Sequence, residues 1–146
     1  MKDTSKLPLK TRTSFFDRMA KLYEDDEQDA KALLYYEKVA AAEPNYYVAQ
    51  RALGYLYDKE AEEFHLKLYQ TKKDDPAYKT LFNSYKQGVL KALPHLEKAQ
   101  ACDPDDDTLD LIKTLHQNIN DEQDLKLLDS RLKDMGKNCI DILTDK

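Results

Sequence analysis

The sequence is poor in the residues that let a chain reverse tightly. Its 146 residues contain only three glycines and five prolines. A protein of strands and hairpins needs more of these residues, because tight turns depend on them. We therefore expect an all-α protein, and its 41% hydrophobic content suffices for one modest, continuous core.

Long apolar runs are also absent. No stretch approaches the roughly 18 consecutive apolar residues of a membrane-spanning helix, so we expect no membrane span. The first residues, MKDTSKLPLK, lack the apolar segment of a signal peptide. We therefore expect a cytoplasmic protein, or a periplasmic or envelope-associated one if a leader is removed from the gene product.

The sequence has no cluster of basic residues. Its 23 lysines and arginines are outnumbered by 28 aspartates and glutamates, which gives a net charge of -5. A protein that binds a phosphate backbone gathers basic side chains on one face. We therefore expect no nucleic-acid partner.

The residue types that carry catalysis or hold cofactors form no motif. His65, His95 and His116 share no metal-ligand spacing. The acidic turn at residues 103–107 lacks the glycine and the terminal glutamate of a calcium loop, so we interpret it as a capping turn. No serine lies in a Gly-x-Ser-x-Gly context, and three scattered glycines build no phosphate loop. We predict a protein that is not an enzyme and has no cofactor or metal.

The only two cysteines are Cys102 and Cys139, which are far apart and form no CxxC motif. We expect two free thiols near helix ends. A disulfide between them is the alternative that the sequence leaves open.

The segment from Ala32 to Tyr57 carries a spaced pattern of small residues, aromatic residues and proline. Ala32 and Tyr36 are followed by Pro44, then by Leu53 with Gly54, and then by Tyr57. Moving back by about 34 residues takes Gln50, Leu53, Gly54 and Tyr57 to Phe16, Met19, Ala20 and Tyr23. Small residues at matching places indicate two helices that approach closely, with aromatic side chains beside them.

This pattern resembles that of tetratricopeptide repeat (TPR) proteins, in which helix pairs recur with that period. The resemblance implies an all-α, TPR-like right-handed stack of about three antiparallel helix pairs. We expect a loose lead-in at residues 1–12, then repeats at residues 13–46, 47–106 and 107–136. Residues 137–146 would form a C-terminal tail or a short capping turn, to which Cys139, Ile140 and Leu143 contribute.

The middle repeat departs from the family pattern in its length. Pro44 lies 21 residues past Tyr23, whereas Pro104 lies 47 residues past Tyr57, an excess of 26. Helical spacing of apolar residues continues through this excess, so we predict two overlong helices at residues 46–70 and 76–102. They would extend the hairpin by about 20 Å. We expect a kink near Pro94, or alternatively a break of the second helix there.

The segment ALPHLEKAQACDPDD at residues 92–106 resembles one in TPR proteins from Bacteroidetes that have a widened middle repeat. After it, we predict a helix at residues 108–118. Asn120 and Gln123 resemble a capping box, opening a last helix that carries Leu125, Leu128, Leu132 and Met135 and ends at Gly136.

In TPR proteins the first helix of each repeat lines a concave groove. Carried over to this chain, the resemblance places nine residues there: Asp17, Lys21, Glu24, Arg51, Tyr55, Asp58, Asp110, Thr114 and Gln117. The corresponding places Asp17, Lys21, Tyr55, Asp107 and Leu111 do not form the family's clamp for a peptide carboxylate. We therefore do not expect binding of chaperone tails.

Three hypotheses follow. The first is a non-catalytic scaffold that binds a protein or an extended peptide, in the groove around Arg51 and Tyr55 or along the long hairpin. The second is an envelope-associated module that binds carbohydrate or another small ligand through exposed tyrosines. The third is a self-assembling structural protein, a homo-oligomer joined through Phe64, Leu68, Tyr78 and Phe82 of the hairpin.

Overall fold

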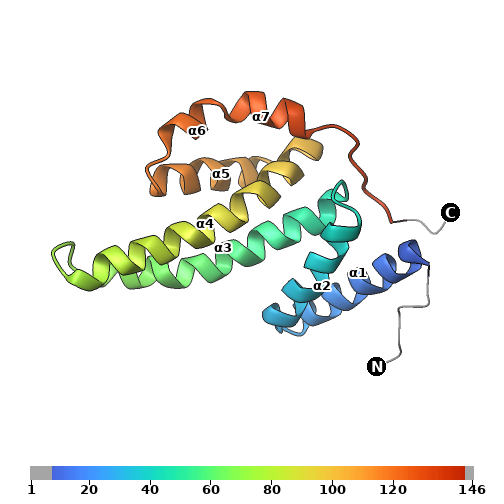
Figure 1. Ribbon diagram of the computed structural model, residues 1–146, viewed down its shortest axis with the longest axis horizontal. Coiled ribbons are helices and arrows are strands. Elements are labelled where there is room, and N and C mark those ends of the chain that lie inside the picture. Colours follow the sequence, from blue (N-terminus) through green and yellow to red (C-terminus); the bar gives the residue numbers. More distant parts are fainter. Residues whose placement is uncertain (1–7, 144–146) are drawn as a thin grey trace.

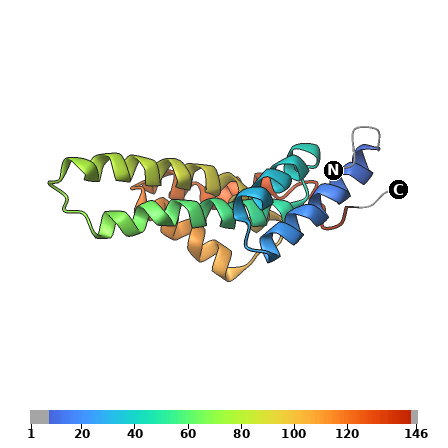
Figure 2. The ribbon, with the colours of Figure 1, turned by 90° about the horizontal axis from the view of Figure 1, so that it is seen from below.

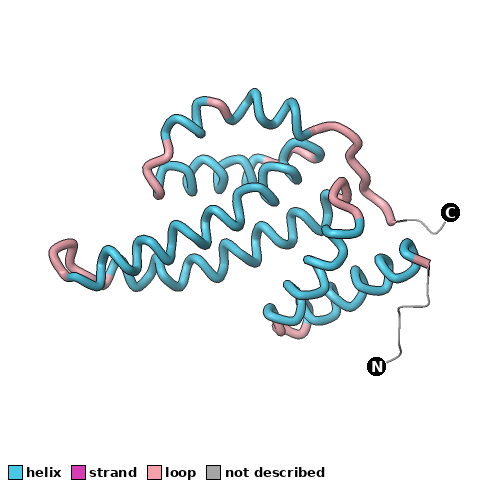
Figure 3. Tube along the Cα trace, viewed as in Figure 1, coloured by secondary structure: helices cyan, strands magenta, loops and turns pink. Residues whose placement is uncertain are grey.

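The structure is a computed structural model that describes residues 8–143, and this part of the chain is almost entirely helical. Figure 3 shows helices joined by short loops, followed by a longer extended segment near the C-terminus. Seven helices lie in the described residues: α1 (Leu9–Asp25), α2 (Asp29–Ala42), α3 (Tyr47–Tyr69), α4 (Pro76–Cys102), α5 (Asp106–Asn118), α6 (Glu122–Lys126) and α7 (Leu128–Met135). The all-α prediction is confirmed.

The helices pack mainly against their neighbours in sequence. Figure 1 shows α1 with α2 at one end, the long pair α3 and α4 in the middle, and α5 to α7 on the other side. The last element departs from simple pairing, since α7 packs against α4. No helix in the described residues combines the length and the apolar content needed to cross a bilayer.

Helix α1 begins at Leu9, earlier than the sequence suggested. Pro8 occupies the position before the helix, and its carbonyl accepts the backbone hydrogen bond of Arg12. The Thr13 hydroxyl donates to the Leu9 carbonyl at 2.7 Å, within the same turn. The expectation of a loose lead-in through residue 12 is therefore wrong for residues 9–12, and residues 1–7 lie outside the described residues.

The long hairpin is formed by α3 and α4, as predicted. Asp75 accepts a hydrogen bond from the backbone nitrogen of Ala77 at 2.9 Å, and Pro76 takes the first helical position, where its missing N–H costs nothing. Helix α4 runs without interruption through Pro94, so the alternative of a break there is wrong. Figure 2 shows the hairpin reaching well beyond the remaining helices.

Two clusters of buried side chains share α3. One joins α1 and α2 to the first half of α3, around Tyr36, Val39 and Leu53. The other joins the second half of α3 to α4, α5 and the start of α7, around Tyr85 and Leu96. Because α3 contributes to both clusters, it connects the two ends of the molecule.

Gly54 marks a close approach of α3 and α4. A Cβ atom at this position would lie 2.5 Å from Leu96 Cδ2, 2.6 Å from Leu96 Cγ and 3.0 Å from the Leu96 backbone nitrogen. The sequence-based inference that Gly54 permits tight helix packing is confirmed.

We expect Gly54→Ala to lower the free energy of unfolding by about 2 to 3 kcal/mol, because the added methyl group displaces the fully buried Leu96. This loss exceeds the gain of about 1 kcal/mol that alanine brings to a helix. Urea unfolding measures the difference. Gln87→Ala, at an exposed position of α4, is the control and should change stability by less than about 0.5 kcal/mol. A Gly54→Ala protein as stable as the parent would contradict the packing.

Asn120 does not begin a helix. Its φ of 59° places it in the left-handed region at the end of α5, where its backbone nitrogen donates to Gln117 and that of Asp121 donates to His116. These two bonds form a Schellman motif, so the predicted capping box is wrong. The last predicted helix is also divided into α6 and α7, which meet at Leu127.

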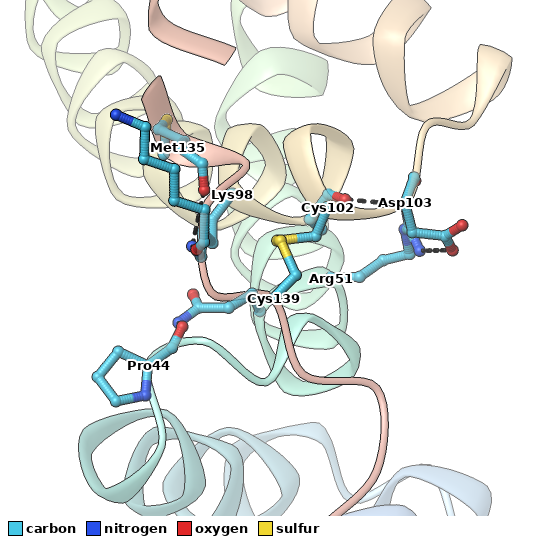
Figure 4. Close-up of a disulfide and its surroundings, with 10 residues drawn as sticks. Pro44, Arg51, Lys98, Cys102, Asp103, Met135 and Cys139 are labelled. Carbon is cyan, nitrogen blue, oxygen red and sulfur yellow. Dashed lines mark hydrogen bonds and ion pairs between the residues drawn. A yellow bond between two sulfur atoms is a disulfide. The ribbon is translucent and has the colours of Figure 1, made fainter. Parts of the chain in front are cut away.

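Cys102 and Cys139 form a disulfide with Cα atoms 5.6 Å apart, so the expectation of two free thiols is wrong. The bond joins the last residue of α4 to the segment after α7 (Figure 4). Beyond it, Ile140 donates to the Asn45 carbonyl at 2.8 Å and accepts from the Tyr47 nitrogen at 3.2 Å. Of the two expectations for residues 137–146, the capping turn is wrong: residues 137–143 form a non-helical tail that crosses to the loop before α3, and residues 144–146 lie outside the described residues.

Candidate functional site

Four of the nine predicted groove residues line one cavity of 590 Å³ between α1, α3 and the turn after α4. Its lining consists of Lys21, Glu24, Tyr36, Tyr47, Val48, Arg51, Ala52, Tyr55 and Asp103. We call this the groove cavity. Glu24 and Tyr55 also border a second cavity of 500 Å³, so the two hollows adjoin.

The other predicted groove residues are distributed differently. Asp58 lines the second cavity, whereas Asp17 is only 6% exposed and lies beneath the surface of α1. Asp110, Thr114 and Gln117 are exposed on α5 and line neither cavity. The structure therefore brings together the residues from α1 and α3 but does not add those from α5.

Arg51 is held at the end of α4 by three hydrogen bonds. Its Nη1 atom donates to Asp103 Oδ2 at 2.9 Å, and its Nη2 atom donates to the backbone carbonyls of Asp103 and Ala99 at 2.5 and 3.4 Å. Figure 4 shows the Arg51 side chain reaching Asp103, next to the disulfide. The guanidinium therefore has a fixed position before any partner arrives.

Tyr55 is fixed by a chain of hydroxyl hydrogen bonds. The Thr108 hydroxyl donates to the Asp105 carboxylate at 2.7 Å, so its single proton is used. The Tyr55 hydroxyl, 2.8 Å from Thr108 Oγ1, must then donate to Thr108. Its oxygen keeps lone pairs for a partner, and the residue is 38% exposed.

Lys21 is oriented by the carboxylate beneath it. Asp17 Oδ2 accepts from Lys21 Nζ at 2.8 Å and from the Tyr46 hydroxyl at 3.3 Å. Burial lowers the pKa of Lys21, but the hydrogen bond and the charge of Asp17 outweigh it, so the pKa is raised. Lys21 is therefore a positive charge fixed at one side of the groove cavity.

Glu24 is positioned by a buried tyrosine. The Tyr36 hydroxyl donates to Glu24 Oε1 at 2.8 Å. Burial, together with the neighbouring Glu24 carboxylate, raises the pKa of Tyr36, so this hydroxyl remains a donor. Glu24 therefore presents a fixed negative charge where the two cavities meet.

The second cavity is strongly acidic. It is lined by Glu24, Glu27, Asp29, Tyr55, Leu56, Asp58, Lys59 and Glu62. Lys59 is paired with Asp29 at 2.7 Å and offsets part of this charge. Burial and the nearby Glu62 raise the pKa of Asp58, as expected where carboxylates crowd together. The groove thus changes from mixed charge around Arg51 to negative charge around Asp58.

The three histidines occupy separate environments. His65 lies on α3 of the hairpin, with Nδ1 3.3 Å from Glu62 Oε1. His95 Nδ1 donates to the Gln50 amide oxygen at 2.6 Å, because that oxygen can only accept. Burial lowers the pKa of His95. His116 lies 2.9 Å from Glu97. No group of residues in the described part of the chain has a metal-binding arrangement.

The sequence missed several residues that shape the groove cavity. Tyr36 is a core residue, 2% exposed, and Asp103 belongs to the predicted capping turn, yet both also line the cavity and fix predicted residues. Periodicity places Tyr36 on the inner face of α2, but it does not reveal which polar atom its hydroxyl reaches.

A scan of protein-family models, a search of curated proteins and a search of solved structures found no match for this sequence.

Proposed function

We propose that this chain is a non-catalytic scaffold of the TPR type, built as a right-handed stack of helix pairs, and that it binds an extended peptide of another protein in its groove. The observation that carries this proposal is the groove cavity, in which Lys21, Arg51 and Tyr55 from two different helices are fixed around one hollow. Such a surface recognises a partner by its shape and charge pattern.

Fixed side chains favour binding because little conformational freedom remains to be lost. Arg51 and Tyr55 already have their hydrogen-bond partners, so a peptide would not need to order them. Tyrosine and arginine are also the residue types that contribute most often to binding energy at interfaces.

The charge of the two hollows favours one kind of peptide. Basic side chains would lie over the acidic cavity beside Asp58 and Glu62, while backbone carbonyl or acidic groups would lie near Lys21. We therefore propose a partner segment with lysine or arginine at one end, bound more weakly as the salt concentration rises.

The disulfide favours an oxidising compartment. Disulfides persist in the periplasm, at cell surfaces and outside cells, whereas the cytoplasm keeps thiols reduced. We therefore propose a periplasmic or envelope-associated location in place of the cytoplasmic one expected from the sequence. Alkylation of the protein in its native cells tests this: Cys102 and Cys139 should react only after a reductant is added.

The groove is tested by identifying partners through crosslinking in native cells and then measuring peptide affinity by calorimetry. We expect Arg51→Ala with Tyr55→Ala to weaken binding by at least about tenfold, the loss of one strong interface contact. Arg18→Ala with Tyr69→Ala is the matched control, because both residues are exposed and line neither groove hollow. Equal peptide affinity of these two double variants would rule out the groove as the binding site.

Self-association through the hairpin is the weaker proposal. Leu68 is buried, and Phe64, Tyr78 and Phe82 already pack against the core of the hairpin itself. Little of this apolar surface therefore remains for a second copy. Sedimentation of the concentrated protein tests the point, and a monomeric mass would remove self-association.

A further inference from the structure

A separate cavity of 330 Å³ lies on the long hairpin, away from the groove. It is lined by His65, Leu68, Tyr69, Thr71, Lys73, Tyr78, Phe82, Tyr85 and Asn118. These residues come from the end of α3, the loop after it, the first half of α4 and the end of α5. The volume falls at the small end of the range for ligand pockets, about 300 to 1,000 Å³, so its occupant is a small molecule.

Flat rings form much of this hairpin cavity. His65 stacks on Tyr85 with ring centres 4.7 Å apart and an interplanar angle of 15°. Tyr69 also lies against His65, with ring centres 4.9 Å apart and an interplanar angle of 50°. Tyr85 is almost fully buried, whereas Tyr69 is 78% exposed. Tyr85 therefore forms a buried, fixed ring at the inner end of the cavity, and Tyr69 forms an exposed ring at its opening.

Two polar groups of the cavity have unused hydrogen-bonding capacity. Asn118 Nδ2 donates to the Tyr85 hydroxyl at 3.0 Å. The Tyr85 proton and Asn118 Oδ1 have no further partner among the described residues. Burial raises the pKa of Tyr85, so the hydroxyl keeps its proton near neutral pH. The inner end of the cavity thus offers one donor and one acceptor.

We propose that the hairpin cavity binds a small, uncharged sugar ring. A pyranose has C–H faces that can lie against the rings of Tyr69 and Phe82, and each of its hydroxyl groups both donates and accepts. A purely apolar molecule would bury the Tyr85 and Asn118 groups without partners, which is unfavourable.

The charges around the hairpin cavity also favour a neutral sugar over an anionic ligand. The lining contains no carboxylate, and its one lysine, Lys73, has no ion pair among the described residues. However, Glu62 lies 3.3 Å from His65 Nδ1 and opposes an anion there. A neutral ligand avoids this conflict while still using hydrogen bonds from Lys73.

The experiment is an NMR titration of the full chain with the methyl glycosides of glucose, galactose, mannose and N-acetylglucosamine. We expect at least one of them to give saturable shifts at His65, Tyr69 and Asn118. Tyr69→Ala should weaken that binding by about tenfold, the contribution of one stacking ring. The control is Tyr55→Ala, which removes an exposed tyrosine from the groove and should leave sugar binding unchanged.

Three outcomes would overturn the proposal. The first is no saturable shift with any of the four glycosides. The second is equal weakening by Tyr69→Ala and Tyr55→Ala. The third is binding of benzoate alone, abolished by Lys73→Met, which would make the site one for aromatic anions. Because Tyr69 is exposed, its variant should fold, and peptide binding in the groove should persist whatever the sugar result.

Discussion

Replacing Cys102 and Cys139 with alanine should lower the free energy of unfolding by about 4 kcal/mol. The disulfide spans 37 residues, and closing a loop of that length removes conformational entropy from the unfolded chain, which raises its free energy by about this much in the loop-entropy estimate. Unfolding in guanidinium, followed by circular dichroism, measures the difference. We expect an effect on this scale because the bond holds α5, α6 and α7 to the end of α4.

The parent protein treated with reductant is the control for the cysteine variant. Both proteins lack the bond, so their stabilities should agree, apart from the small effect of changing two side chains. If the double variant is as stable as the oxidised parent, the loop-closure argument fails. If it is much less stable than the reduced parent, the thiols themselves contribute to packing.

Arg131→Met should destabilise the protein by about 3 kcal/mol, because it leaves a buried carboxylate without its cationic partner. Glu97 is only 5% exposed, and it accepts from Arg131 Nε at 2.8 Å, from Arg131 Nη2 at 3.2 Å and from His116 Nε2 at 2.9 Å. Arg131 is one of the side chains that join α7 to α4; Lys98, whose Nζ donates to the Met135 carbonyl at 2.7 Å, is another. Thermal and chemical unfolding of the variant measure the loss.

Lys133→Met is the matched control for Arg131, because it removes an exposed charge from the same helix. It should change stability by less than about 0.5 kcal/mol. Replacing Glu97 and Arg131 together with leucine and methionine should recover part of the lost stability, since no buried charge is then left alone. A double variant less stable than Arg131→Met would contradict this account.

Local sequence patterns predicted the long hairpin well. Asp75 and Pro76 mark the start of α4, and helical spacing of apolar residues on both sides of the turn at residues 70–75 excludes a long loop. Gly54 also indicated the close contact of α3 and α4. The spacing and the cap depend on residues within a few turns of each other, and Gly54 is a local signal of close packing, so the sequence carries these features directly.

Features that depend on distant residues could not be derived in the same way. Cys102 and Cys139 meet only because the chain returns across α4 after α7, a path that no spacing rule specifies. Asn120 illustrates a different ambiguity, since asparagine is common both at helix starts and in left-handed positions at helix ends.

The candidate site was also predicted only in part, because contacts between distant residues complete it. The resemblance to TPR proteins selected Lys21, Arg51 and Tyr55, which do line one cavity. It could not select Asp103, which fixes Arg51 across 52 residues of sequence. It also included Asp110, Thr114 and Gln117, which line neither groove hollow.

The disulfide also keeps the chain in one piece after a single cleavage between its two cysteines. A protease that cuts one peptide bond between residues 103 and 138 leaves two fragments that are still covalently joined through sulfur. The carboxyl-terminal fragment would keep its hold on the loop before α3 through Ile140, and α5 would stay packed on α4. A molecule cut once in this loop would therefore stay in one piece until the disulfide is reduced.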